Sequence, residues 1–374
     1  MQLSGARIGG QVIVDQTVIT NDSGPALHAD DLRADRTIFL YRSTARGAGE
    51  KGAVRLLGVR SGDQMVVDQM EITNDSGPAL LAHNLRTEHD LFLREATVYG
   101  TGEEGAVQLS GAHIGGQFGV VDTRLDNDSG PLMALDELRV DGLLVLPMTT
   151  VCRQALAGLD RQGCPDGSRQ LEVRDLVFSR LGDVSWRQWL HLLVHHTPDY
   201  LPQPFQQLAA VERVAGHDGN ARAVLVAQQD DLRRRDPDAL GGRVGRWRHR
   251  AWGLLGRYGY RAHRLIIALF VVLTLASGTA YVAGQTPTRP GHHAAERVSP
   301  SLPGTPCSTA ELLGLGIDRG LPLGATGLRA RCDLDTATRR GQAFTYALWG
   351  FQALLWALTT LAIAAYTGLV RKPT

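Results

Sequence analysis

The chain has 374 residues, of which 43 are glycine, and its formal net charge is only +1. This length suffices for two or three domains with cores of their own. The near-zero total excludes a uniformly basic or acidic molecule but hides a split, because residues 1–150 carry 21 acidic and 12 basic side chains. The remainder is correspondingly basic, which points to a membrane or nucleic-acid surface for that part of the chain.

A five-residue motif, Asn-Asp-Ser-Gly-Pro, recurs three times at a spacing of 53 residues, starting at Asn21, Asn74 and Asn127. Leucines and glycines around the motif keep the same register without a gap. The first 150 residues are therefore predicted to be a repeat array. Its copies cover about 1–51, 52–104 and 105–150.

The motif has the composition of a corner between strands. Its Asn and Ser side chains can bond their own backbone, its glycine can take a positive φ, and its proline has a fixed φ. The glycines in this position are Gly24, Gly77 and Gly130. Alternating apolar residues, as in Val12-x-Val14, predict short strands with one buried face. We expect a β-solenoid, a right-handed β-helix, in which each repeat makes about three coils of roughly 18 residues.

The array starts without a cap. Met1 falls inside the repeat pattern and no signal peptide precedes it, so we expect the solenoid either to begin upstream or to self-associate through this end. Residues 151–184 then form a polar connection, in which Leu171-x-Val173 and Leu176-x-Phe178 are candidates for closing strands.

Helices are predicted over residues 185–240. Ser185 is a candidate N-cap for a helix over Trp186–His195. A helix pair follows, similar to a tetratricopeptide unit, with its turn at 216–219. The apolar faces are expected to contain Trp186, Trp189, Leu190, Leu193, Leu208, Val211, Val214, Val224, Leu225 and Leu232. A single pair cannot bury both faces, so it is expected to cap the solenoid.

Two uncharged stretches, 265–284 and 344–370, are long enough to cross a bilayer. A basic juxtamembrane segment, 241–264, precedes the first. Its arginines expected at anionic lipid head groups are Arg243, Arg246, Arg248, Arg250, Arg257, Arg261 and Arg264. This excess predicts a two-pass protein of the plasma membrane with both termini in the cytoplasm. Membrane lipids are therefore favoured over nucleic acid as the partner of this segment.

The loop 285–343 would then lie outside, where an oxidising environment favours a disulfide between Cys307 and Cys332. Two free thiols remain the alternative. Cys152 and Cys164 would lie inside, and their spacing matches no zinc or redox motif, so reduced structural cysteines are expected there.

Several short segments match motifs of enzymes and binding proteins but lack the neighbouring residues that those sites require. Gly47–Gly52 and Gly100–Gly105 match G-x-G-x-x-G, but strand-like residues follow them instead of the helix that a dinucleotide site requires. The pairs His195-His196 and His292-His293 have no third ligand nearby in the sequence. No catalytic residue, cofactor or metal site is expected.

Several segments resemble a family of membrane proteins of high-GC Gram-positive bacteria. They are Gly5–Gln11, Gly24–Leu27, Pro202–Ala209, Val224–Gln229, Leu358–Leu361 and Thr367–Arg371. Members are commonly labelled membrane-associated oxidoreductases, and their solenoid part is similar to pentapeptide-repeat and bactofilin-like β-helices. The resemblance implies redox chemistry but supplies no catalytic motif. Members also often have more repeats.

The leading functional hypothesis is a cytoplasmic β-solenoid scaffold or binding protein anchored to the membrane. One alternative is the membrane-associated oxidoreductase that the family label implies. Another is a two-span sensor or transport accessory, with the external loop as its receiver.

Overall fold

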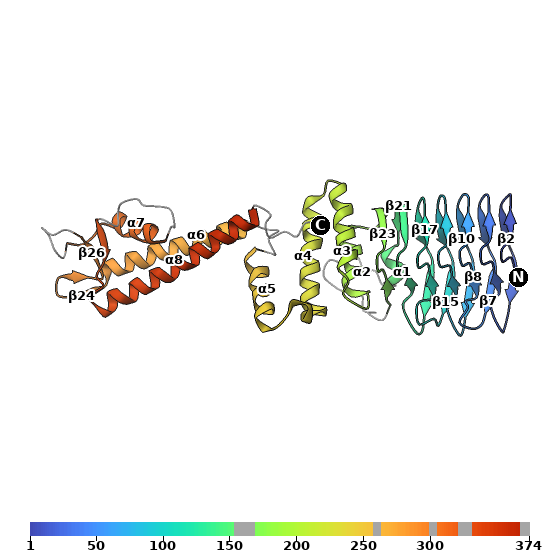
Figure 1. Ribbon diagram of the computed structural model, residues 1–374, viewed down its shortest axis with the longest axis horizontal. Helices are drawn as coiled ribbons and strands as arrows, with labels where there is room; N and C mark the ends of the chain where they lie inside the picture. The colour runs from blue at the N-terminus through green and yellow to red at the C-terminus, as the bar shows by residue number, and fades with distance from the viewer. Residues whose placement is uncertain (153–168, 257–262, 299–304, 321–330, 367–374) are drawn as a thin grey trace. The chain divides into compact units, whose positions relative to one another are not determined.

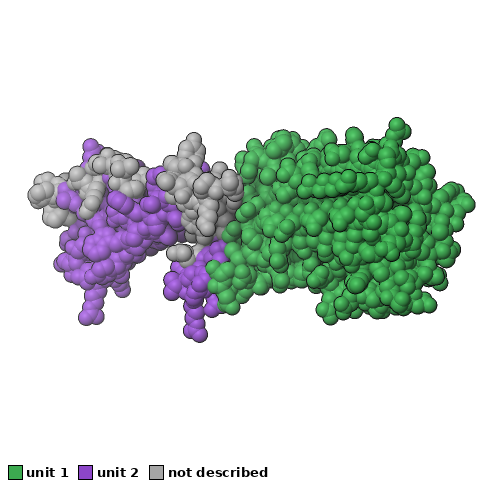
Figure 2. Space-filling view, turned by 45° about the vertical axis from the view of Figure 1, so that its right-hand side comes forward, with its two compact units in different colours: residues 1–239 green, residues 240–374 purple. Residues whose placement is uncertain are grey.

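The computed structural model describes residues 1–152, 169–256, 263–298, 305–320 and 331–366 (Figure 1). The chain divides into two compact units, residues 1–239 and 240–374, which Figure 2 colours separately. Some residues of the sequence predictions lie outside the described residues. These are Cys164, Arg257, Arg261, the parts of the 285–343 loop at 299–304 and 321–330, and the end of the second apolar stretch at 367–370.

The first unit is a β-solenoid of about five turns followed by helices, as expected. Its strands stack in parallel into three sheets that run along the axis (Figure 1). One sheet contains β3 (Val18–Thr20), β7 (Thr44–Gly47), β11 (Glu71–Asn74), β15 (Thr97–Gly100) and β19 (Arg124–Asn127). A second contains β4 (Leu27–His28), β8 (Val54–Arg55), β12 (Leu80–Leu81), β16 (Val107–Gln108), β20 (Met133–Ala134) and β22 (Leu171–Glu172).

The third sheet has the most strands, because each coil contributes two strands to it, one in each of two rows. Its short strands are β1 (Arg7–Ile8), β5 (Arg33–Ala34), β9 (Arg60–Ser61), β13 (Arg86–Thr87) and β17 (His113–Ile114). Its longer strands are β2 (Val12–Asp15), β6 (Ile38–Tyr41), β10 (Met65–Asp68), β14 (Leu91–Arg94) and β18 (Phe118–Val121). At the closed end β21 (Arg139–Val145) joins both rows and pairs with β23 (Val177–Leu181).

The expected coil length is wrong. Arg7 lies beside Arg33, and Arg33 lies beside Arg60, so successive coils are 26 and 27 residues apart. Each 53-residue repeat therefore makes two coils, not three of roughly 18. One coil is longer than expected because it carries four strands, two of them only two residues long, with a corner after each.

The interior is filled by alternate residues of the strands. In β2, Val12 and Val14 are buried while Ile13 between them is exposed, and Val67 in a later coil is buried on the same row as Val14. The period-2 pattern in the sequence is confirmed. Because the strands are in register, each inward side chain packs on its equivalents above and below, and the core forms one continuous column.

The predicted closing strands and helical cap are confirmed. The cap consists of α1 (Met148–Val151), α2 (Trp186–His195), α3 (Pro202–Val214), α4 (Asp218–Arg235) and the short 3-10 helix η1 (Pro237–Leu240). The Gln203 and Gln207 side chains of α3 donate to the carbonyl oxygens of Leu176 and Phe178 in the last coil. These bonds satisfy backbone groups that another coil would otherwise pair.

Two details of the helix faces differ from the prediction. Val214 is 88% exposed at the end of α3, since the chain turns away from the core there. On α2 the buried residues are Trp189, Leu192 and Leu193, whereas Trp186 is only half-buried. The face of α2 is thus rotated toward Leu192.

The second unit contains α5 (Arg243–Gly256) and two longer helices, α6 (His263–Gln285) and α8 (Arg339–Tyr366). Within them, Leu265–Gln285 and Arg339–Ile363 are long and apolar enough to cross a membrane. Their exposed side chains include Phe270 and Trp356, which are large and apolar. Such surfaces suit a lipid environment better than water.

The segment between α6 and α8 has more structure than the expected linker. It contains β24 (Pro287–Arg289), β25 (His292–His293), β26 (Ala295–Arg297), α7 (Thr309–Gly320) and β27 (Cys332–Leu334). Helix α7 lies against α6 so closely that a Cβ on Gly316 would stand 2.4 Å from Cα of Ser277. Only glycine permits this approach, so α7 belongs to the same packed unit as the two long helices.

Candidate functional site

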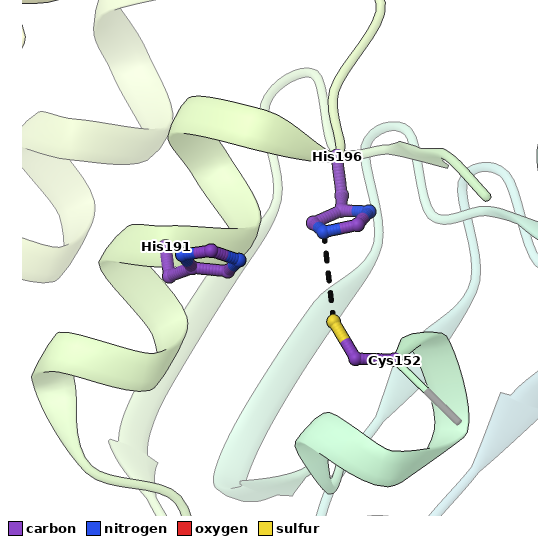
Figure 3. A group of neighbouring side chains, drawn as sticks. All are labelled: Cys152, His191 and His196. Atoms are coloured by element: carbon purple, nitrogen blue, oxygen red, sulfur yellow. Dashed lines mark hydrogen bonds between the residues drawn. The ribbon is translucent and has the colours of Figure 1, made fainter. Parts of the chain in front are cut away.

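Three side chains that can hold a metal meet where the last coil of the solenoid joins its helical cap. Cys152 follows α1, His191 lies on α2, and His196 is the C-cap residue of the same helix (Figure 3). Ser185 is the N-cap of α2 and forms a capping box. Its hydroxyl accepts a hydrogen bond from the backbone N–H of Gln188, and the Gln188 side-chain oxygen accepts one from the backbone N–H of Ser185. This fixes where the helix starts and hence where its histidines lie.

The distances between the three residues are short. One ligand atom from each lies within 4.8 Å of the others. Cys152 Sγ is 3.5 Å from His196 Nε2, the contact drawn in Figure 3. Cys152 and His196 are almost fully buried, and His191 is half-buried.

The surroundings set the protonation of both rings. His196 Nδ1 lies 2.8 Å from the carbonyl oxygen of Arg169, which can only accept, so Nδ1 carries the proton and Nε2 presents its lone pair toward Cys152. Burial, with the neighbouring His195 and His196 adding to it, lowers the pKa of His191 from 6.5 to about 4. His191 is therefore neutral at physiological pH, and its Nε2 is buried without a hydrogen-bond partner.

Arg169 holds this junction together. Its buried guanidinium donates to the carbonyl oxygens of Val151, Leu125 and Thr150 and to the carboxylate of Asp126, at 2.6–3.1 Å. The Arg169 side chain thus links α1 to β19, the last strand of the five-stranded sheet. Its own carbonyl orients His196, so the solenoid end and the ligand geometry are coupled.

Cys152 is disulfide-bonded, whereas the sequence predicted a reduced thiol. The sequence prediction rested on compartment and spacing, and neither of these reports the tertiary contacts of a cysteine. Sequence reasoning also missed the cluster as a whole. Cys152 and His196 are 44 residues apart in the chain, and no local spacing marks them as partners.

The predicted corners lie where the sequence placed them and form a ladder along the solenoid. Asn74 Nδ2 donates to the carbonyl oxygen of Pro78 in its own corner and to that of Gly49 in the preceding coil, at 2.7 and 2.9 Å. Asn127 makes the equivalent bonds to Pro131 and Gly102. Asn21 Nδ2 donates to the Pro25 carbonyl oxygen, and Asn21 Oδ1 accepts from the backbone N–H of Ser23. The G-x-G-x-x-G segments are the corners of the intervening coils, so their structural interpretation is confirmed.

The reason for glycine in these corners differs from the prediction. Gly24, Gly77 and Gly130 do not have a positive φ. A Cβ on Gly77 would stand 2.5 Å from the carbonyl oxygen of Gly49, and one on Gly130 would stand 2.2 Å from that of Glu103. At Gly77 and Gly130, glycine is therefore required by the close approach of the neighbouring coil.

A row of basic side chains, the arginine ladder, runs along the short strands of the third sheet. It consists of Arg7, Arg33, Arg60, Arg86, His113 and Arg139, each paired in register with the next. The arginines are exposed. Among the described residues, Arg139 and His113 pair with Asp141, whereas the four arginines from Arg7 to Arg86 make no ion pair. The sequence prediction did not identify this row, since it considered only the net acidic charge of residues 1–150 and not the spacing of their arginines.

The other predicted residues lie in the second unit. Cys307 and Cys332 form the predicted disulfide, with Cα atoms 6.2 Å apart. The basic segment is largely helical, as α5, and Arg243 and Arg250 on it are exposed. Arg246 is half-buried, and Arg248 and Arg264 lie on α5 and α6.

Comparison with known proteins gives no family assignment. No family model matches the chain, and no curated protein or solved structure is significantly similar to it. The resemblance to membrane-associated oxidoreductases therefore stays a prediction.

Proposed function

We propose that this protein is a binding scaffold, a β-solenoid anchored at the cytoplasmic face of the plasma membrane by α6 and α8. The arginine excess before α6 supports this orientation, because positively charged flanks are retained in the cytoplasm. The disulfide between Cys307 and Cys332 supports an oxidising location for the segment between the two helices.

The observation that carries the proposal is the arginine ladder. Strands in register repeat every 4.7–4.9 Å or so, which brings like charges close together along the row. Directly opposed like charges destabilise a sheet. The four consecutive arginines make no ion pair among the described residues, although the unit has an acidic excess. Their repulsion does not stabilise the fold, so we infer that they bind a partner. An extended anionic chain, such as an acidic peptide segment, has the matching charge and shape.

The contribution of the ladder can be estimated. Two opposite charges 4 Å apart attract by about 1 kcal/mol in water, so three arginines contribute about 3 kcal/mol at low salt. This corresponds to an affinity change of about 100-fold. The attraction should weaken as salt screens it.

The test uses the full chain in nanodiscs of neutral lipid and the fluorescence anisotropy of a labelled poly-glutamate peptide. We expect the triple variant Arg33→Gln, Arg60→Gln, Arg86→Gln to bind about 100-fold more weakly at low salt. The matched control, Arg124→Gln, Arg180→Gln, Arg213→Gln, removes the same charge from exposed positions off the ladder. Equal losses in the two variants would show that net charge, not the ladder, binds the peptide.

A further inference from the structure

The cluster of Cys152, His191 and His196 has the composition of a zinc site. Zn²⁺ binds thiolate and neutral imidazole, and three protein ligands leave a fourth position for water or a small anion. Both histidines suit this role, since the Nε2 of His196 is deprotonated and oriented by a backbone carbonyl, as metal-binding histidines commonly are. The Nε2 of His191 is buried with no partner.

We propose that Cys152, His191 and His196 form a redox-gated Zn²⁺ site between the solenoid and its cap. In the oxidised chain the sulfur of Cys152 belongs to a disulfide and cannot be a thiolate ligand. Two equivalents of a small thiol, or one dithiol, reduce that bond to two cysteine thiols and are themselves oxidised to a disulfide. Zn²⁺ then replaces the proton of Cys152, which passes to solvent, and the two imidazoles complete three ligands.

The site would cross-link two parts of the unit. Cys152 ends α1, which packs on the last coil, while both histidines belong to α2 of the cap. His191 also lines a groove, together with Trp186, Leu190 and His195. In a reducing compartment the metal would thus join the cap to the last coil.

Cobalt(II) serves as the probe, because a thiolate ligand gives it a charge-transfer band and tetrahedral ligation gives it strong visible bands. The full chain, purified in detergent, is titrated with Co²⁺ before and after reduction with a phosphine, and Zn²⁺ is then added as competitor. We expect one Co²⁺ per reduced chain, with the thiolate band, displacement by Zn²⁺, and no such band before reduction. A reduced chain that lacks the band, or an oxidised chain that shows it equally, overturns the proposal.

Variants separate this cluster from the other cysteines. Cys152→Ser should abolish the thiolate band, although it retains Cys307 and Cys332. His191→Ala, at a half-buried position on a helix, should retain the fold and weaken Co²⁺ binding at least about tenfold. The matched control His89→Ala, at an exposed position in the solenoid away from the cluster, should leave the affinity unchanged. An unaltered affinity in His191→Ala overturns the proposal even if Cys152→Ser does not fold. These readouts do not depend on the arginine ladder or on membrane orientation.

Discussion

The stacked corners give the sharpest test of the fold, because the same glycine occurs with and without a preceding coil. Gly130 is packed under the corner of the coil before it, and an added Cβ would stand 2.2 Å from the carbonyl oxygen of Glu103 and 2.7 Å from its carbon. At Gly24 the nearest atom would be Asn21 Nδ2 at 3.5 Å. Neither glycine has a positive φ, so alanine is not excluded by conformation at either site.

The magnitudes follow from these distances. An ordinary contact begins at 3.4 Å, so Gly130→Ala forces the two corners apart by about 1.2 Å. Overpacking of this kind costs about 1–3 kcal/mol. The loss of the bond from Asn127 to the Gly102 carbonyl adds about 1 kcal/mol. Gly24→Ala creates no clash, and reduced freedom of the unfolded chain should stabilise it by about 0.4–1 kcal/mol.

The assay is urea unfolding of residues 1–239, a compact unit with its own core, followed by circular dichroism. Amide hydrogen exchange at Asp128, whose N–H donates to the Gly100 carbonyl, reports the corner directly. The reduced freedom of the unfolded chain applies to both alanine variants and cancels between them. We therefore expect Gly130→Ala to be less stable than Gly24→Ala by about 2–4 kcal/mol, with faster exchange at Asp128. Equal stability of the two variants would refute the stacking argument.

Three further changes test other parts of the structure. Val67 is fully buried, so Val67→Asp should destabilise the solenoid by several kcal/mol. Glu103→Lys, on an exposed corner, should change the free energy of unfolding by less than about 0.5 kcal/mol. Equal effects of the two substitutions would contradict the assignment of faces. Burial, and then Asp136, raises the pKa of Glu172 from 4.5 to about 7, so the folded state binds more protons than the unfolded state between these values and loses stability as pH rises through them. Glu172→Gln should remove that slope and stabilise the unit at about pH 8 by no more than about 1 kcal/mol, given its partial exposure, while the exposed Glu88→Gln should retain the slope in the same pH series of urea titrations. Gly316→Leu should separate α7 from α6 and lower the melting temperature in detergent, whereas Gly278→Leu, with no atom within 4 Å of the added Cβ, should not; equal melting temperatures would argue against this packing.

The sequence predicted the solenoid because a strand's side chains alternate and its corners need particular residues. It gave the wrong coil length because alternate corners use different residues for the same backbone path. Asn74 begins one type of corner and Gly100 the other, so only every second coil matches in sequence. The arginines at Arg33, Arg60 and Arg86 did carry the shorter period, but exposed charges are a weak signal beside the buried pattern.

The cluster at the junction could not have been predicted in the same way. Its ligands come from two segments, and their approach depends on α2 packing against the last coil. The predicted N-cap of α2 is confirmed, since Ser185 caps the helix that carries both histidines. The position of Cys152 relative to His196 is decided only by tertiary contacts, among them the bonds of the buried Arg169.

The central claim, a solenoid held at the cytoplasmic face by two spanning helices, can be tested by cysteine labelling in intact cells. Val214 on unit 1 and Val298 between α6 and α8 are both exposed, at 88% and 57%. A membrane-impermeant maleimide should label Val298→Cys in intact cells, and Val214→Cys only after the membrane is permeabilised. Labelling of Val214→Cys in intact cells, with Val298→Cys protected, would contradict the account.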